Sequence, residues 1–381
     1  MSVYKRESGR YTVVIAKTEG STQRRSLGTF ATRKEAGKAE REALAARDRG
    51  IDLAPAKVTV AELLMRYIHD RKTRCTAKTL QEYEKMTNGY ILPHLGTKAL
   101  AKLRPAHIAE WQQLIEERGG DAGRSLSAKT TFHARALLSA ALRWGCKMQL
   151  LAVNPCAAVD APKIRRSDAK ALTRDEIARL MAVANGTRWG PFVMLALTLG
   201  ARRGELLALR WSRIDTGNRT VTIAASLSQT REAGIALKGT KTDRTRTIPL
   251  SREALEALRK QRVIQAADKL RVGSFYKDTG YVFTEELGSY ISPMAATNAY
   301  ARLARRAQLS TTRLHDLRHS AATTLLLAGV DVRTVADILG HSVATTTLAT
   351  YAHVMADAQR DAIDRLGTAL SGLAFESRPA N

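Results

Sequence analysis

Hydrophobic residues recur at helical spacing through most of the chain, and two short stretches near the N-terminus are β-type instead. Apolar spacing of three and four residues predicts amphipathic helices, whereas short runs rich in β-branched and aromatic residues between turn residues predict strands. The strand-like stretches are Tyr11-Thr12-Val13-Val14-Ile15 and Ser26-Leu27-Gly28-Thr29-Phe30. A capping box of Thr32 with Glu35 then predicts a helix that stops before Gly50. We expect residues 1–55 to form a small three-stranded sheet braced by one helix.

The next region, residues 58–160, carries four helical patterns. Capping boxes at Thr59 and Thr79 predict two helix starts, Pro105 predicts a third, and Ser127 precedes a fourth. Four amphipathic helices can close one bundle around their apolar stripes. The aromatic and leucine residues of these stripes are therefore interpreted as core.

The last region, residues 168–381, mixes helices with short strands and follows a basic, apolar-poor stretch that reads as a linker. A capping box of Thr173 with Glu176 predicts its first helix. Two strand-like segments, 220–224 and 245–250, are separated by a Gly- and Lys-rich turn at 238–244. The predicted fold class is multidomain, mainly α with small β-sheets (α+β).

The charge of the chain points to a polyanionic partner. Its formal net charge is +25 and its pI is about 10.4, and neutralising phosphates with Lys and Arg releases condensed counterions. An anionic membrane surface is the competing partner, but no apolar run reaches the roughly 20 residues of a spanning helix and no secretory pattern is present. We expect a soluble cytoplasmic protein that binds nucleic acid, with no membrane partner.

The cysteines suggest neither a disulfide framework nor a zinc site. Cys75, Cys146 and Cys156 are odd in number and lack C-x-x-C spacing. They are interpreted as small buried hydrophobic residues.

Five separated motifs carry candidate chemistry. In chain order they are Leu199-Gly200-Ala201-Arg202-Arg203-Gly204-Glu205, Lys241 eight residues before Pro249, His315 with Arg318, Leu339-Gly340-His341, and Tyr351 with His353-Val354. In this order and spacing they resemble the tyrosine recombinases, specifically phage-type or mobile-element integrases. Leu199 departs from the threonine that is usual in this family.

The resemblance implies a site-specific recombinase that cuts and rejoins DNA through a 3′-phosphotyrosyl intermediate without ATP, and so integrates and excises a phage or mobile element. It implies an arm-type DNA-binding domain at 1–55, a helical core-binding domain at 58–160, and a mixed α/β catalytic domain with a C-terminal tail at 168–381. For the N-terminal sheet, a solvated basic surface is the alternative to a DNA-binding one.

The partners implied are double-stranded DNA attachment sites of the core and arm types and further copies of the chain in a tetramer on DNA. An excisionase or directionality factor and a host DNA-bending protein are further candidates. The expected location is the bacterial cytoplasm or nucleoid. A tail helix with Ile363, Leu366 and Leu370 on one face would dock on a neighbouring protomer, or else pack on its own domain.

Two arginines suit a phosphate clamp, because a guanidinium offers a planar fork of donors and stays charged. These are Arg202 and Arg318, and Arg318 lies three residues after His315, which on a helix puts both side chains on one face. The alternative for Arg202 is an ion pair with Glu205 on its own helix.

The resemblance makes Tyr351 the nucleophile. A phenol titrates near ~10 and an imidazole near ~6.5, so His315 is a sensible proton acceptor. His341 is interpreted as a donor to the phosphate, and Lys241 as the general acid for the 5′ oxygen, although Lys238 is close enough to be confused with it. No metal or other cofactor is required for this chemistry.

Three rival interpretations stay open. A metallohydrolase would use His315 and His319 with His341 or His353 as a third ligand, but it leaves the basic charge unexplained. A non-catalytic DNA-binding protein explains the charge and nothing else. A type IB topoisomerase uses similar chemistry but needs no second DNA site.

Overall fold

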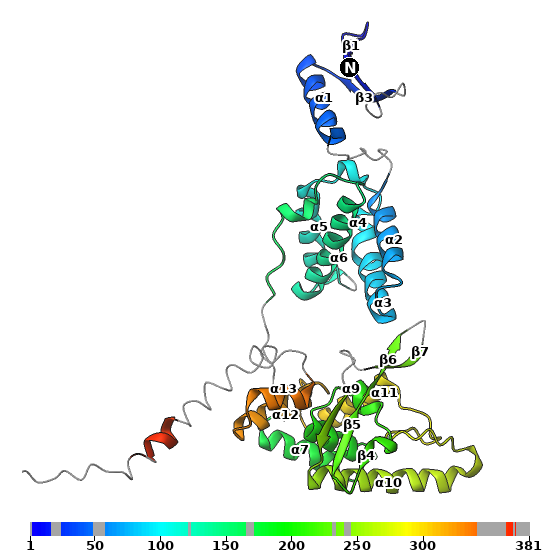
Figure 1. Cartoon of the computed structure of the whole chain (residues 1–381), viewed down its shortest axis with the longest axis vertical. Coiled ribbons are helices and arrows are strands. Elements are labelled where there is room, and N and C mark those ends of the chain that lie inside the picture. The colour runs from blue at the N-terminus through cyan, green and yellow to red at the C-terminus, as the bar shows by residue number, and fades with distance from the viewer. Residues whose placement is uncertain are drawn as a thin grey trace, which may run out of the picture. The chain divides into compact units, whose positions relative to one another are not determined.

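The computed structural model describes residues 2–16, 24–48, 58–120, 123–164, 171–230, 234–239, 245–340, 363–368 and 370 (Figure 1). The chain divides into two compact units, Met1–Arg166 and Ser167–Asn381. The predicted fold class is confirmed: the structure is mainly helical and carries small sheets. None of the described helices is both long and apolar enough to cross a lipid bilayer.

The N-terminal part is the predicted sheet with one helix. Strands β1 (Ser2–Lys5), β2 (Tyr11–Ala16) and β3 (Arg24–Phe30) form an antiparallel sheet in the order β1-β2-β3, followed by α1 (Arg33–Asp48). Thr32 and Glu35 cap α1 reciprocally, each accepting a 3.2 Å hydrogen bond from the other's backbone N–H. Val13 of the sheet packs against Ala36 and Ala43 of the helix, so this part has a small core of its own.

A helical bundle follows. Its elements are α2 (Val60–Arg71), α3 (Ala77–Met86), the π-helix η1 (Thr87–Ile91), α4 (Leu92–Leu95), the 3-10 turn η2 (Leu100–Lys102), α5 (Pro105–Arg118), α6 (Ala128–Lys147) and the 3-10 turn η4 (Pro155–Ala158). The predicted starts at Thr59, Pro105 and Ser127 are confirmed. The prediction at Thr79 was wrong by one turn, because the Thr76 hydroxyl caps α3 by accepting from the Thr79 N–H at 3.3 Å.

The bundle core is built from the predicted stripes. Leu63 and Leu64 of α2, Trp111 of α5 and Leu138 of α6 are buried in one apolar cluster. Because each helix turns its apolar side inward, burial of these stripes stabilises the bundle without any buried charge among its described residues.

The second unit combines helices with two small sheets. Its helices are α7 (Arg174–Ala184), α8 (Gly190–Leu199), α9 (Arg203–Leu207), α10 (Arg252–Val272), α11 (Pro293–Arg306), α12 (Asp316–Leu327) and α13 (Val332–Leu339), with 3-10 turns η5 (Trp211–Arg213) and η6 (Gly273–Phe275). Its strands are β4 (Ile214–Asp215), β5 (Thr220–Ile223), β6 (Ala225–Thr230), β7 (Gly234–Gly239) and β8 (Arg246–Pro249).

One sheet has the antiparallel order β4-β5-β8, and β6 pairs with β7 in a separate hairpin. The two predicted strands are therefore confirmed as β5 and β8. The turn predicted at 238–244 was wrong at its start, since Lys238 pairs with Ser226 inside the hairpin. The hairpin lacks a run of β-branched residues, so its strands depend on pairing with each other.

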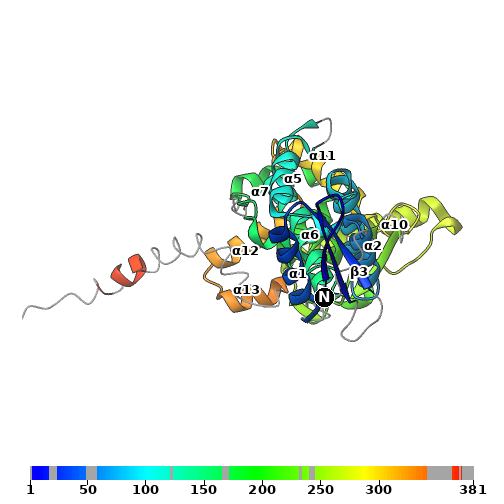
Figure 2. The same cartoon turned by 90° about the horizontal axis from the view of Figure 1, so that it is seen from above.

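Helix α8 lies at the centre of the second unit. It is apolar on nearly all sides, and α7, α10 and α12 pack around it. It ends at Gly200, whose φ of 56° is a left-handed conformation that glycine adopts without strain. Helices α12 and α13 lie side by side (Figure 2). A Cβ atom at Gly200 would come within 2.7 Å of Leu339 Cδ2 and 3.4 Å of Ala321 Cβ, so the turn after α8 packs against α12 and α13.

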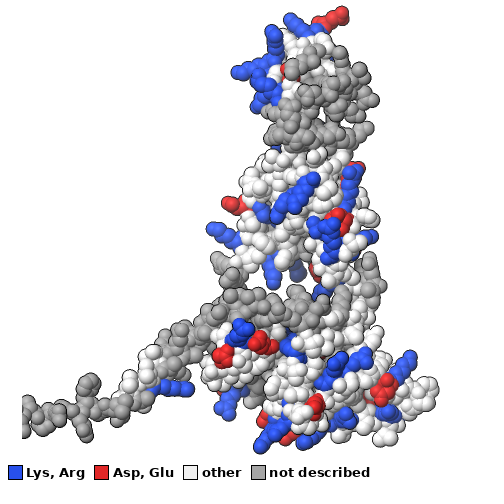
Figure 3. Space-filling view, viewed as in Figure 1, with Lys and Arg blue, Asp and Glu red and all other residues white. Residues whose placement is uncertain are grey.

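Lys and Arg side chains dominate the charged surface seen in Figure 3, in keeping with 61 Lys and Arg residues against 36 Asp and Glu. A surface of this sign attracts phosphate-rich partners over a distance set by the ionic strength.

Candidate active site

Arg202 stands at the N-terminal end of α9, directly after the turn at Gly200. It is the N-cap residue of that helix, with an extended backbone, and its side chain is 32% exposed. One guanidinium nitrogen lies 2.9 Å from Glu205 Oε1, and the other donates to the Gly340 carbonyl oxygen at 3.3 Å. The turns after α8 and α13 are thus joined through one arginine that still reaches solvent.

Glu205 lies between Arg202 and Arg246 and is only 1% exposed. These three charged residues are called the cluster below. The second carboxylate oxygen of Glu205, Oε2, accepts from the Arg202 backbone N–H at 2.9 Å and from Arg246 of β8 at 2.6 Å. Burial alone would raise the pKa of Glu205, but the hydrogen bonds and charge of Arg246, together with the bonds from Arg202, outweigh it and lower the pKa. Glu205 is therefore an ionised, buried carboxylate held between two arginines.

Arg318 lies in the first turn of α12 and is 4% exposed. Its Nη1 donates to the Gly200 carbonyl oxygen at 2.7 Å. That carbonyl belongs to the C-terminal end of α8, where backbone oxygens lack helical partners and the helix dipole favours a cation. Because Gly200 is two residues from Arg202, this bond brings the two arginine motifs together.

His315 is the N-cap residue of α12, and part of the residue is exposed to solvent while the rest packs against its neighbours. Desolvation, together with the neighbouring His319 and the positive charges of Arg318 and Arg202, lowers the pKa of His315 to about 4, although Asp316 acts in the opposite direction. The His315 and His319 rings meet edge to face with their centroids 5.0 Å apart. An imidazole in this setting is neutral at physiological pH and can accept a proton.

Two family models match the chain. Residues 170–357 match the phage integrase family, and residues 59–115 match the phage integrase N-terminal SAM-like domain. The tyrosine recombinase XerD of Mycobacterium tuberculosis is 30% identical over 284 residues, which cover 71% of this chain and 86% of that protein. The chain belongs to the phage integrase family of tyrosine recombinases. It is an enzyme that breaks and rejoins DNA strands.

Solved structures share the fold of this recombinase. A Tn1549 transposon integrase fragment in complex with transposon right end DNA superposes with a TM-score of 0.68 at 22% identity, covering 81% of this chain and all of that one. A lambda integrase tetramer bound to a Holliday junction gives a TM-score of 0.60 at 20% identity, covering 90% of this chain and 96% of that one. Because both identities are below 25%, these similarities establish a shared fold and nothing further.

Three of the six predicted catalytic residues of the recombinase lie in the described structure. Arg202, His315 and Arg318 come together, as the bond of Arg318 to Gly200 and the influence of both arginines on the pKa of His315 show. Lys241, His341 and Tyr351 lie outside the described residues, as does the side chain of Lys238. Their catalytic roles stay predictions.

The ion pair considered as the alternative for Arg202 does form, with Glu205 as its partner. It does not occupy the whole side chain, because the other guanidinium nitrogen bonds to Gly340 and a third of the side chain is exposed. Arg202 therefore pairs with Glu205 and still exposes part of its side chain to solvent.

Arg246 is a residue of this cluster that sequence reasoning missed. It lies two residues before Ile248 on β8, so the two side chains share the inward face of the strand, and Ile248 is 3% exposed. A charged residue in phase with a buried isoleucine indicates a buried ionic partner, and this signal was present in the sequence.

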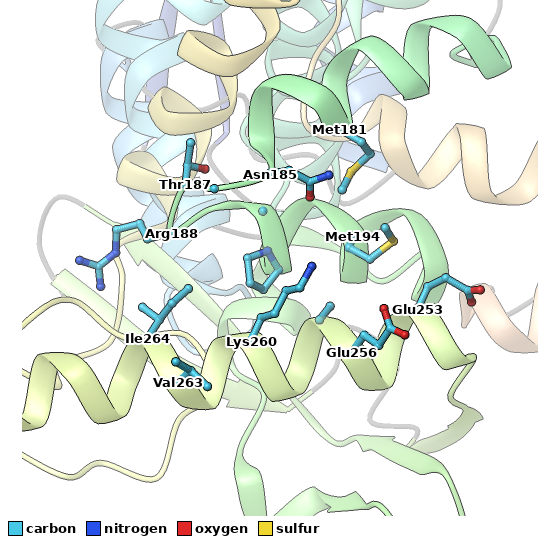
Figure 4. A pocket seen from close by; sticks show the side chains of 14 residues that line it. Met181, Asn185, Thr187, Arg188, Met194, Glu253, Glu256, Lys260, Val263 and Ile264 are labelled. Carbon is cyan, nitrogen blue, oxygen red and sulfur yellow. The ribbon is translucent and has the colours of Figure 1, made fainter.

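A cavity of the second unit lies away from these residues. It measures about 480 Å³ between α7, α8 and α10, with Met181, Met194 and Lys260 among the side chains around it (Figure 4). None of the described catalytic candidates lines it. Among the described residues no group of three or more His, Cys, Asp or Glu side chains could hold a metal ion; His341 and His353 lie outside them.

Proposed function

We propose that this recombinase is an integrase, which inserts and excises a phage or mobile element at specific attachment sites. The observation that carries the proposal is the convergence of Arg202, Arg318 and a neutral His315 at the turn after α8. The sheet β1–β3, which precedes the SAM-like segment and carries Lys5, Arg6 and Arg10 on or near its strands, supports a second DNA site.

The two arginines would hold the scissile phosphate. Each guanidinium is anchored to a helix-end carbonyl, Arg202 to Gly340 and Arg318 to Gly200. Anchored cations need little reorganisation when charge develops on the two non-bridging oxygens in the transition state. Because guanidinium groups supply the positive charge, the residues present account for phosphate activation.

In the proposed reaction the Tyr351 hydroxyl oxygen attacks the scissile phosphorus, and the bond from phosphorus to the 5′ oxygen breaks. His315 accepts the phenol proton and Lys241 gives a proton to the leaving 5′ oxygen, while His341 donates to the phosphate. The products are a 3′-phosphotyrosyl ester and a 5′ hydroxyl. A second 5′ hydroxyl then attacks the ester, so resealing needs no ATP.

The domain roles belong to the same proposal. Residues 1–55 would bind arm sites, residues 58–160 would bind core sites, and residues 168–381 would carry catalysis. As in the lambda integrase tetramer bound to a Holliday junction, four copies would assemble on DNA. Accessory bending and directionality proteins would join them, in the bacterial cytoplasm.

The test of cleavage uses a nicked duplex, called the core duplex below, which carries a candidate attachment core identified as a sequence repeated in the DNA that flanks the gene. The full chain should form a protein–DNA adduct that survives detergent and a metal chelator, and Tyr351→Phe should form none. Retention of the adduct in Tyr351→Phe would reject the nucleophile, and sensitivity to chelator would favour a metallohydrolase. Relaxation of supercoiled DNA without any recombination would favour a type IB topoisomerase.

The test of integration removes residues 1–55. The shortened chain should cleave the core duplex within about threefold of the full chain, because the anchored arginines are untouched. Integration into a plasmid target that carries arm and core sites should fall strongly. Equal integration by both chains would contradict the two-site proposal while leaving the recombinase chemistry intact.

A further inference from the structure

The cluster around Glu205 holds more positive charge than a single ion pair needs. The carboxylate bonds to Arg202 at 2.9 Å and to Arg246 at 2.6 Å, with a second Arg246 contact at 3.4 Å. One carboxylate and two guanidinium groups sum to a net charge of +1. Glu205 is 1% exposed, Arg246 12% and Arg202 32%, so the excess charge reaches solvent through Arg202.

We propose that Arg246 is a positioning residue that neutralises Glu205 and so leaves the charge of Arg202 available to the scissile phosphate. Without Arg246, both carboxylate oxygens would be free to pair with Arg202, and the cluster would carry no net charge. Because Glu205 is buried and bonds directly to Arg202, water screens its charge only weakly, and the carboxylate would offset the positive charge of Arg202. The inference rests on the proposed role of Arg202 as a phosphate ligand.

The surroundings of Arg246 fix its position as well as its charge. Its Nε donates to the Ile338 carbonyl oxygen at 2.9 Å, at the end of α13. Gly340 adopts a left-handed φ of 69°, and a Cβ atom there would come within 2.6 Å of Arg246 Nη1. Glycine therefore leaves room for the guanidinium, which lies between Glu205 and the helix end.

The same helix end also bonds to Arg202 through the Gly340 carbonyl oxygen. Arg246 and Arg202 thus share two partners, a carboxylate and the C-terminal end of α13. If Arg246 only connected β8 to α13, its hydrogen bond to the Ile338 carbonyl oxygen would be sufficient. The bonds to both Glu205 oxygens are the feature that a neutralising role explains.

The experiment measures single-turnover cleavage of the core duplex by the full chain, with a normal phosphodiester or with a methylphosphonate at the scissile position. The methylphosphonate lacks the negative charge that a cation would stabilise. Arg246→Met should slow cleavage of the phosphodiester by about 10²-fold and of the methylphosphonate by less than about threefold. A merely structural role would slow both substrates equally.

A second substitution that restores the net charge of the cluster should restore part of the cleavage rate. The cluster is +1 in the native chain, zero in Arg246→Met and again +1 in the double variant Arg246→Met with Glu205→Gln. The double variant should therefore cleave the phosphodiester roughly tenfold faster than Arg246→Met. Arg246→Lys keeps the charge but lacks the fork, and should fall between the native chain and Arg246→Met.

Folding is checked by thermal melting and by binding of the core duplex. If Arg246→Met fails to fold while the double variant folds and cleaves, the defect comes from the charge of Glu205 that Arg246 neutralises in the native chain, which supports the proposal. Equal losses on both substrates, no recovery in the double variant, or failure of both variants to fold would overturn it. Arg202→Ala separates the two proposals: if it leaves phosphodiester cleavage unchanged, the role of Arg202 itself fails.

Discussion

The helical bundle and the second unit bury different kinds of side chain. The described bundle core contains threonines at 87 and 131 as its buried polar residues, and the rest is apolar. The described core of the second unit buries Glu205, Asp316 and Arg318 among its apolar residues. The bundle therefore gains its stability from apolar burial, whereas the second unit accepts the cost of desolvating charges.

These three buried charges have partners near the ends of helices or strands. Asp316 accepts from the Arg313 backbone and side chain, and the Ser320 hydroxyl donates to its carbonyl oxygen. The Ser320 hydroxyl in turn accepts from the Leu172 N–H at 2.8 Å, which ties the start of this unit to α12. Such bonds fix the direction in which a helix end points, and apolar packing does this less well.

The largest expected effect follows from this contrast. Replacing Arg318 by Ala should reduce single-turnover cleavage of the core duplex by about 10²–10³-fold, because a preorganised donor to the phosphate is lost. The Gly200 carbonyl oxygen also loses its donor, which costs about 1–3 kcal/mol of stability. Rates measured below the melting temperature separate the two effects, and a cleavage loss below about threefold would remove Arg318 from the phosphate clamp.

The matched control lies in the bundle. Leu138 is fully buried in α6, and Leu138→Ala should cost about 2–5 kcal/mol of stability through lost burial and a residual cavity. At a temperature where the variant is folded and at a saturating concentration of enzyme over the core duplex, its cleavage rate should stay within about threefold of the native rate. A large chemical defect in this variant would show that the two regions are not separable.

A smaller effect concerns pH. Because the pKa of His315 is lowered to about 4, the imidazole stays unprotonated from pH 7 to 5.5. Cleavage at subsaturating enzyme, which reports the free protein, should change by less than about twofold over that range, whereas an ordinary pKa of ~6.5 would predict about a tenfold loss. An acid limb with its midpoint near the ordinary value would contradict the proposed base.

The same shift has a consequence for stability. Unfolded His315 binds a proton near ~6.5 and folded His315 only near 4, so stability is lost as pH falls between these values. Since part of the residue is exposed to solvent, the loss should be small. Thermal melts of the native chain and His315→Gln at pH 7 and 5 check the direction, with the native chain losing more.

Much of the fold was predictable from local patterns. Thr59, Ser127 and Thr173 begin helices where their hydroxyls predict, because a cap depends on residues three positions away. The helix start predicted at Thr79 was wrong because Thr76, one turn earlier, also carries a hydroxyl that can cap the helix. The hairpin β6–β7 was not predicted because the residues of its strands have a weak intrinsic preference for β structure and are stabilised by pairing with each other.

The sequence by itself determined the helices, the basic charge and the order of the motifs, since these depend on neighbours along the chain. Arg202, His315 and Arg318 could also be identified from the sequence, but their proximity in space could not. Only the tertiary structure decided that the ends of α8 and α13 lie where these arginines can bond to them, and that Arg246 meets Glu205. Contacts across 41 or 118 residues depend on how buried elements pack, and no local pattern contains that information.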